Sequence, residues 1–452
     1  MKRLLSFFLL IPSLTFGALS ANTTLEVRPG GNDLNGGGFV TGATGTDYSV
    51  QDAAQFSGTD LASANGTSTS PVVTSGVHNF VAADVGNIIQ ITAGASWTVG
   101  FYQIVSVANN AAKLDRACGT AAMLTVGAWA EGGALASIGR AGAAVTVAGM
   151  RVFVYNAGST VYSITSATNS VSGGCFNPSA AVSGIIVGYA TNRTINNTDP
   201  PPTIQINVST ATIFGSNCYA EIRNLILDGN NQTNSRATFA IQSLVQNCLI
   251  KNFTGAYAIS GAAYLCKFTS NTSRTLFGTQ ARAFYCEAYA NTATPFNTAT
   301  YLVAVNCLSY NNTGATTDGF APGQSSSFYN CVAYGNGRYG FNRQNGPCVI
   351  VNCISEGNTT AAFSSNNNTS PLWVINFAYD SGFTAPATQT YYSIGAIHYT
   401  GGSVFVNAAG GNFALNNIAG RGALLRQAGF ATFPTGTTVG YPDIGAAQSK
   451  SP

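Results

Sequence analysis

Charged side chains are scarce in this chain, so the few that recur together are the first candidates for chemistry. Asp, Glu, Lys and Arg make up 8% of the 452 residues, against about 25% in an average soluble protein. The best group falls on successive repeats of the second half of the chain and consists of Asp318, Arg338, Arg343 and Glu356. Asp318 and Arg338 each stand shortly before a Gly-Phe pair, so we expect them to meet near one turn. An arginine beside carboxylates would suit general base catalysis. A surface ion-pair network is the alternative, and we favour it.

Three tyrosines, Tyr289, Tyr310 and Tyr334, each stand three residues after a repeated cysteine. If the cysteine points inward, strand alternation sends the tyrosines outward. They would then form a ridge on which sugar rings pack, or would simply stabilise the sheet as neighbouring aromatics. Apolar residues directly after the cysteine, such as Leu308 and Val332, complicate this interpretation. Either that face is covered, or the inward set is shifted and the tyrosines are core.

Other patterns with a known chemistry are missing from the sequence. The acids of the repeats form no Asp-Asp or Asn-x-Asp pair, and His78 and His398 share no motif. No phosphate-binding loop, dinucleotide fingerprint or Cys/His zinc spacing occurs, so we predict neither a metal site nor a cofactor. The formal net charge of +3 argues against nucleic acid as a partner.

The elements that would position these side chains are coils of a repeat. Cysteines recur at steps of 18 to 24 residues, at Cys248, Cys266, Cys286, Cys307, Cys331 and Cys353. Leu225 and Phe377 extend the column at its two ends, which implies that its members point inward. Cysteine then serves as a small hydrophobe. We expect free thiols, because parallel Cβ vectors stay near the coil spacing of about 4.8 Å, whereas a disulfide needs about 3.8 Å.

Two further columns keep the same register. Asparagine recurs at the following turn, at Asn271, Asn291, Asn312, Asn336 and Asn358. Phenylalanine recurs 10 to 13 residues after the cysteine, at Phe277, Phe296, Phe320, Phe341 and Phe363, with Ile259 before them. Three columns in one register predict an all-β fold, a right-handed parallel β-helix. A β-sandwich with evenly spaced strands is the alternative.

The rest of the chain differs from the repeats in its sequence pattern. Residues 1–21 are predicted to be a secretory signal, with Lys2 and Arg3 before an apolar run. We expect an N-terminal cap with a small inserted β module over 22–125, the β-helix over 126–390 with regular coils from about 216, and a C-terminal coil and cap over 391–452. No later stretch is long and apolar enough to span a bilayer. A disulfide among the cysteines outside the column stays open; these are Cys118, Cys175, Cys218 and Cys348.

These features resemble the exported right-handed β-helix proteins of the pectate-lyase-like superfamily. The resemblance rests on the opening Val27 to Asp33, the block Val85 to Ile91, the Asn-Cys repeats and the closing Asp443-Ile444-Gly445-Ala446. It implies an extracellular polysaccharide or cell-surface glycan as partner. A lyase of this group would use an Arg or Lys base, often with calcium, and a hydrolase would use paired Asp residues.

Three functional interpretations follow. The one we favour is a secreted or cell-surface protein without catalysis, which binds glycans or has a structural or adhesive role. The second is a polysaccharide lyase or glycoside hydrolase whose site lies near Asp318, Arg338, Arg343 and Glu356. The third is self-association through a poorly capped end of the solenoid.

Overall fold

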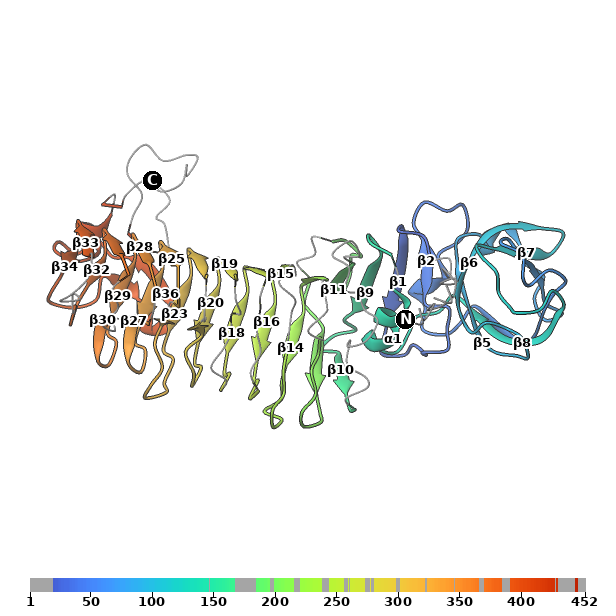
Figure 1. Ribbon diagram of the computed structural model, residues 1–452, viewed down its shortest axis with the longest axis horizontal. Coiled ribbons are helices and arrows are strands. Elements are labelled where there is room, and N and C mark those ends of the chain that lie inside the picture. Colours follow the sequence, from blue (N-terminus) through green and yellow to red (C-terminus); the bar gives the residue numbers. More distant parts are fainter. Residues whose placement is uncertain are drawn as a thin grey trace, which may run out of the picture. The chain divides into compact units, whose positions relative to one another are not determined.

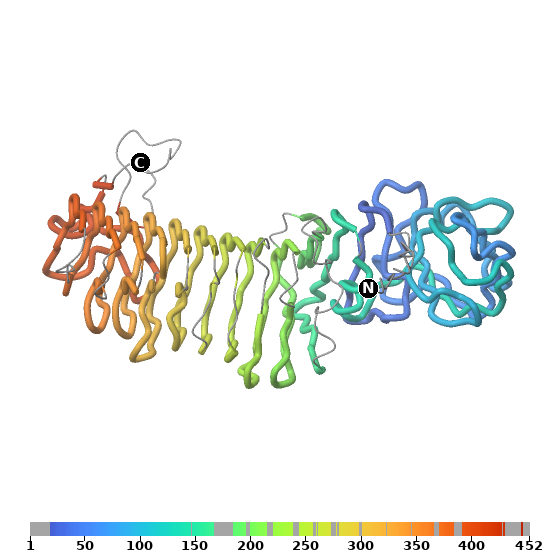
Figure 2. The backbone as a smooth tube through the Cα atoms, viewed as in Figure 1, coloured from blue at the N-terminus to red at the C-terminus, as the bar shows by residue number. Residues whose placement is uncertain are grey.

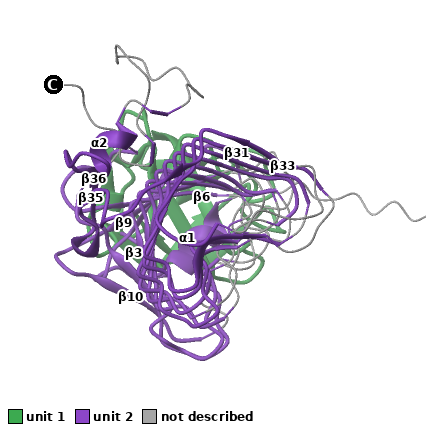
Figure 3. Cartoon of the chain, turned by 90° about the vertical axis from the view of Figure 1, so that its left-hand side faces the viewer, with its two compact units in different colours: residues 1–23, 34–133 green, residues 24–33, 134–452 purple. Residues whose placement is uncertain are grey.

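The computed structural model divides the chain into two compact units. One contains residues 1–23 and 34–133, and the other contains residues 24–33 and 134–452 (Figure 3). The structure describes residues 19–145, 147–166, 184–195, 199–214, 220–237, 244–255, 259, 261–272, 277, 280–297, 301–321, 323–344, 346–365, 370–383, 391–426, 428–429 and 444–445. Residues 1–18 of the predicted signal segment 1–21 lie outside them. None of the described helices is long and apolar enough to cross a membrane.

The larger unit is a parallel β-solenoid, in which each coil adds one strand to each of up to three sheets (Figures 1 and 2). The first sheet runs through β1 (Thr23–Val27), β9 (Arg151–Tyr155), β11 (Ile185–Tyr189), β13 (Glu221–Arg223), β15 (Leu244–Gln246), β17 (Ala262–Tyr264), β19 (Arg282–Phe284), β22 (Val303–Val305), β25 (Ser326–Tyr329), β28 (Cys348–Val351), β31 (Leu372–Ile375) and β33 (Tyr391–Ile394). The second contains β10 (Val161–Ile164), β12 (Thr203–Ile206), β14 (Ile226–Asp228), β16 (Leu249–Lys251), β18 (Lys267–Thr269), β20 (Glu287–Tyr289), β23 (Leu308–Tyr310), β26 (Val332–Tyr334), β29 (Ile354–Glu356), β32 (Ala378–Tyr379) and β34 (Ile397–His398). The third contains β21 (Phe296–Asn297), β24 (Phe320–Ala321), β27 (Tyr339–Arg343) and β30 (Ala361–Ser365). A short helix, α1 (Ile138–Ala144), precedes β9.

The cysteine column lies inside the solenoid, as predicted. All six cysteines are buried and free, and Leu225 and Phe377 continue the column at its ends with no exposed area. The thiols donate to main-chain carbonyls, as in the bond of 3.3 Å from Cys266 Sγ to Val245 O. The column therefore fills core volume and satisfies part of the backbone at once.

A sharp bend in a left-handed backbone conformation precedes each cysteine of the column. The residue before Cys307 is Asn306, with φ of 53°, and the residue before Cys353 is Asn352, with φ of 52°. Asparagine tolerates this conformation better than other residues with a Cβ atom, which explains the repeated Asn-Cys pair. Leu265 and Tyr285 occupy the same bend with φ of 54°.

The asparagine column is a continuous ladder of buried amides. Asn291 Oδ1 accepts from the main-chain nitrogen of Asn271 at 3.0 Å and from its Nδ2 at 3.1 Å. Asn291 Nδ2 donates to Phe268 O at 3.1 Å and to Asn312 Oδ1 at 2.8 Å. Each amide thus bonds the coils before and after it, so the turn leaves none of these polar groups unpaired.

The phenylalanine column stacks along the third sheet. Centroids of successive rings lie 5.3 Å apart for Phe277 and Phe296, 4.7 Å for Phe296 and Phe320, and 4.8 Å for Phe320 and Phe341. The isolated bridge between Ile259 and Phe277 continues the column toward the N-terminus. The predicted all-β class and solenoid are confirmed by these three columns together.

The smaller unit contains a closed antiparallel barrel of six strands, which confirms the expected small β module near the N-terminus. In order around the barrel these are β3 (Phe56–Ser63), β4 (Val72–Thr74), β7 (Ala111–Leu114), β6 (Gly100–Ala108), β5 (Ile88–Ala93) and β8 (Leu124–Glu131). The unit also contains β2 (Gly38–Val40) and the short 3-10 helices η1 (Tyr48–Val50) and η2 (Ala82–Asp84). Buried aromatic and aliphatic side chains such as Phe80, Trp97 and Trp129 form its core.

The C-terminal segment folds back along the outer side of the second sheet. It consists of the hairpin β35 (Phe405–Asn407) and β36 (Asn412–Leu415), joined by η4 (Ala408–Gly410), and of α2 (Gly422–Leu425). Its apolar side chains form one cluster with Val332, Ile354 and Ala378 of the coils. The segment therefore covers a side of several coils, which explains the apolar residues that follow the cysteines.

The bend conformation makes a testable prediction at Leu265, which is 47% exposed in a left-handed backbone. We expect Leu265→Asn to raise the free energy of unfolding by about 1 kcal/mol, because Asn adopts this conformation at lower cost. Thermal unfolding of the full chain measures the change. Leu265→Ala is the matched control, since it removes the same side chain without relieving the backbone. An equal gain in both variants would contradict the explanation.

Candidate functional site

Asp318 and Arg338 form the ion pair that their spacing predicted. Arg338 Nε donates to Asp318 Oδ1 at 2.7 Å, and Nη2 donates to Oδ2 at 2.6 Å. The carboxylate also accepts from Asn342 Nδ2 at 2.8 Å and from Tyr339 N at 3.3 Å. The Asp318 side chain is 1% exposed and that of Arg338 is 32% exposed. A buried carboxylate with four donors holds its arginine in one fixed orientation.

The pair borders a hollow of about 360 Å³ on the surface of the solenoid. Its other polar lining consists of hydroxyl and amide side chains from four consecutive coils, namely Thr272, Thr292, Thr294, Thr316, Asn297 and Gln344. The volume falls in the range of small-molecule sites, about 300–1,000 Å³. Because neighbouring coils repeat at about 4.8 Å, the lining forms rows that follow the long direction of the stack.

Local hydrogen bonds fix the shape of the hollow. Thr294 Oγ1 accepts from the main-chain nitrogen of Asp318 at 2.9 Å. Thr317 Oγ1 donates to Thr292 O at 2.8 Å, across neighbouring coils. Thr272 and Thr292 each follow an asparagine of the buried ladder, so the ladder places their exposed side chains at equivalent positions. The hollow is thus a direct product of the repeat.

The electrostatics of the pair do not suit general base catalysis. The hydrogen bonds and charge of Asp318 raise the pKa of Arg338 above its usual value, although burial opposes them. A base must release its proton readily at the working pH, and this arginine holds it more tightly. The Asp318 carboxylate accepts four hydrogen bonds, from Arg338, Asn342 and the main chain of Tyr339, so it too is poorly placed to accept a proton from a substrate. The arrangement suits recognition by the rest of the guanidinium and by the surrounding hydroxyls.

The two other charged candidates have different partners. Arg343 is fully buried, and its guanidinium donates to Gly346 O at 2.7 Å and 3.0 Å and to Ser370 O at 2.7 Å. Glu356 lies in β29, where its Oε2 accepts from Tyr399 Oη at 2.9 Å and Val404 N at 3.0 Å. Both residues hold other segments of the chain in place. The structure brings together only Asp318 and Arg338 of the four.

The tyrosine ridge is partly covered by the C-terminal hairpin. Tyr289 and Tyr310 stack with ring centroids 5.2 Å apart, but Phe413 of the C-terminal hairpin lies 4.9 Å from Tyr310 and 5.8 Å from Tyr334. Burial raises the pKa of Tyr310 to about 12. Phe413 thus covers part of Tyr310 and Tyr334, which are half-buried, and sugar binding by the three tyrosines stays a prediction. Of the two explanations for the neighbouring apolar residues, the covered face is the one observed.

Every described cysteine is buried, so none of them offers a thiol exposed to solvent. Burial raises the pKa of the column thiols Cys307 and Cys331 well above the usual value. Cys118 and Cys348 are free and buried, and burial raises their pKa to about 11 and about 12. Cys175 and Cys218 lie outside the described residues. Thiols that stay protonated at neutral pH are poor nucleophiles and poor metal ligands.

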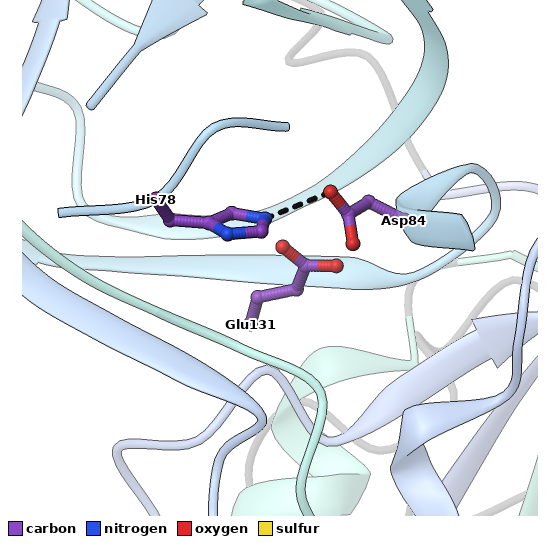
Figure 4. Close-up of side chains that lie close together, drawn as sticks. All are labelled: His78, Asp84 and Glu131. Carbon is purple, nitrogen blue, oxygen red and sulfur yellow. Dashed lines mark hydrogen bonds and ion pairs between the residues drawn. The ribbon is translucent and has the colours of Figure 1, made fainter. Parts of the chain in front are cut away.

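Two groups of buried charged residues were missed by the sequence analysis. In the solenoid, Glu26 forms ion pairs with Arg28 at 3.1 Å and Arg193 at 3.3 Å. In the smaller unit, His78, Asp84 and Glu131 place one ligand atom each within 4.8 Å of one another (Figure 4). His78 and Asp84 are close in sequence, but only the pairing of β8 in the barrel brings Glu131 to them. No short motif carries that signal.

Comparison with known proteins finds similarity only among solved structures. No known protein family and no curated protein matches the chain. A pectate lyase has 14% sequence identity and a TM-score of 0.41, over 70% of this chain and 92% of that one. The A-module of a mannuronan C-5 epimerase from Azotobacter vinelandii has 10% identity and a TM-score of 0.34, over 56% and 87%. A tailspike protein from Pseudomonas phage LKA1 has 10% identity and a TM-score of 0.14, over 78% and 61%. At these identities and TM-scores, the likenesses carry no argument about the family or the activity of this chain.

The ion pair predicts an asymmetric response to substitution. We expect Arg338→Met to lower the free energy of unfolding by about 3 kcal/mol, because it leaves the Asp318 carboxylate buried without its charge partner. Asp318→Asn is expected to cost less, roughly 1 kcal/mol, since Arg338 is partly exposed and can be solvated. Denaturant unfolding of the two variants and of the double variant tests this. The double variant should be more stable than Arg338→Met, and the opposite order would refute the account.

The C-terminal hairpin supplies a separate prediction. We expect Phe413→Ala to weaken docking of the hairpin by about 3 kcal/mol, because Phe413 is 3% exposed and packs on Tyr310 and Tyr334. Hydrogen exchange should then speed up within 405–415 while the central coils stay protected. Val406→Ala is the control on the same hairpin, since Val406 is 57% exposed. Unchanged exchange in Phe413→Ala would show that other contacts hold the segment.

Proposed function

We propose that this protein is an exported, non-catalytic glycan-binding β-solenoid. Its binding site is the hollow beside Asp318 and Arg338. The observation that carries the proposal is the lining, in which hydroxyl and amide side chains surround one fixed arginine. Such groups donate and accept hydrogen bonds as sugar hydroxyls do. Hydrogen bonds from Arg338 to Asp318 raise the pKa of this arginine, which disfavours it as the base of a lyase.

The shape of the lining supports a polymer as the ligand. Thr272 and Thr292 come from successive coils and occupy the same place in each. A chain of sugar residues lying along the stack would meet the same kind of hydroxyl at each coil. The ion pair with Asp318 offsets the charge of Arg338, so binding would depend on hydrogen bonds more than on net charge.

A substitution that fills the hollow tests the proposal. We expect the wild-type protein to co-sediment with at least one member of a panel of acidic and neutral polysaccharides, without producing unsaturated uronates or new reducing ends. Thr292→Trp should weaken that binding about tenfold or more, which corresponds to about 1.4 kcal/mol.

Thr359→Trp is the matched control, because Thr359 is exposed and follows an asparagine of the same ladder. It lies three coils from Thr292 and does not line the hollow. It should bind like the wild type. Equal binding by both tryptophan variants would place the site elsewhere. Chain cleavage that disappears in Thr292→Trp would replace the proposed role with an enzymatic one.

A further inference from the structure

A buried group of three potential metal ligands lies in the smaller unit, away from the hollow. His78 follows β4, Asp84 ends η2 and Glu131 ends β8. His78 is 9% exposed, and Asp84 and Glu131 are fully buried. His78 Nε2 lies 2.8 Å from Asp84 Oδ2, and Figure 4 shows the Glu131 carboxyl group facing the same space.

The carboxylate oxygens of this group have few partners among the described residues. Asp84 Oδ2 is bonded by His78 and by Val81 N at 2.7 Å. Asp84 Oδ1 and both oxygens of Glu131 are buried without a hydrogen-bond partner. Unpaired buried polar atoms are costly, and three on two adjacent carboxylates are unusual. No described Lys or Arg forms an ion pair with either one, and the one titratable partner is His78, which meets Asp84 but leaves Glu131 unpaired.

The closeness of the two carboxyl groups points the same way. Ligand atoms of Asp84 and Glu131 lie within 4.8 Å of each other in an apolar setting, where adjacent carboxylates repel one another. A bound divalent cation would remove this penalty and give the unpaired oxygens a partner.

Aromatic side chains hold the histidine ring in one orientation. Phe56 stacks on His78 with centroids 3.6 Å apart, and Phe80 meets its edge at 5.0 Å. Phe80 and Trp129 belong to the barrel core beside it. An apolar surrounding of this kind limits access by water, which strengthens the attraction between a cation and carboxylates.

We propose that His78, Asp84 and Glu131 bind a divalent transition metal of the zinc type, as a structural site that ties η2 and the segment after β4 to the end of β8. One imidazole and two carboxylates suit Zn²⁺, which binds such ligands at about 2.0–2.2 Å. Calcium prefers six to eight oxygen ligands, roughly twice what this site offers.

The test uses the full chain, freed of metal with a chelator and titrated with ZnCl₂. We expect one zinc ion per chain by calorimetry and a higher thermal unfolding midpoint in zinc than in the chelator. Glu131→Gln keeps the shape of the side chain but removes its charge, and we expect it to lower zinc affinity by at least about 100-fold. Glu26→Gln is the control, because Glu26 is an equally buried carboxylate with arginine partners in the solenoid.

The outcomes separate the metal site from a protonated carboxyl group. If Glu131 is simply held neutral by a proton, zinc will shift neither the midpoint of the wild type nor that of Glu131→Gln, and the proposal fails. Equal zinc binding by the wild type and Glu131→Gln also overturns it, because the metal then lies elsewhere. Preferential binding of Ca²⁺ over Zn²⁺ would overturn the assigned class of metal.

Discussion

The solenoid depends on satisfying the backbone at two left-handed bends in each coil that carries both a column cysteine and a ladder asparagine. One bend precedes the column cysteine and the other precedes the ladder asparagine, as at Asn311 and Gly335 with φ of 51° and 59°. A bend turns main-chain groups away from the sheet ladders, and only the next coil can bond them. The amides of Asn291 and Asn312 provide those bonds. This ladder sets the register of the strands, of the phenylalanine stack and of the threonines that line the hollow.

This constraint explains why so much of the fold could be predicted. A residue in a repeat meets its own equivalent one coil later, so a column such as Cys307 and Cys331 is visible in the sequence alone. The meeting of Asp318 and Arg338 followed from the same logic, because both precede a Gly-Phe pair. The hollow beside them was not predicted, since its volume depends on where short loops such as 314–318 run between strands.

Contacts that involve segments outside the repeat could not be predicted from the sequence. Tyr310 and Phe413 are about 100 residues apart, and no periodicity joins them. The tyrosines were expected to be exposed because the hairpin that partly covers them, β35 and β36, comes from a part of the chain without the repeat. The same holds for Glu131, whose approach to His78 depends on the antiparallel register of β8 with β3 and β5. Long-range pairing of this kind is set by packing rather than by local pattern.

Because charged residues are scarce in this chain, few cations are available to pair with each buried carboxylate. Asp318 is offset by Arg338, and Glu26 is offset by Arg28 and Arg193. Both arginine-paired sites therefore follow the rule that buried charges are paired. Asp84 and Glu131 have no described arginine or lysine partner, although they are as deeply buried as Glu26, and only Asp84 meets the imidazole of His78. Glu356 is also buried without a described cation partner, but it accepts two hydrogen bonds, whereas three oxygens of Asp84 and Glu131 accept none from the described residues. The proposed cation, held by one imidazole and two carboxylates, would give those oxygens a partner.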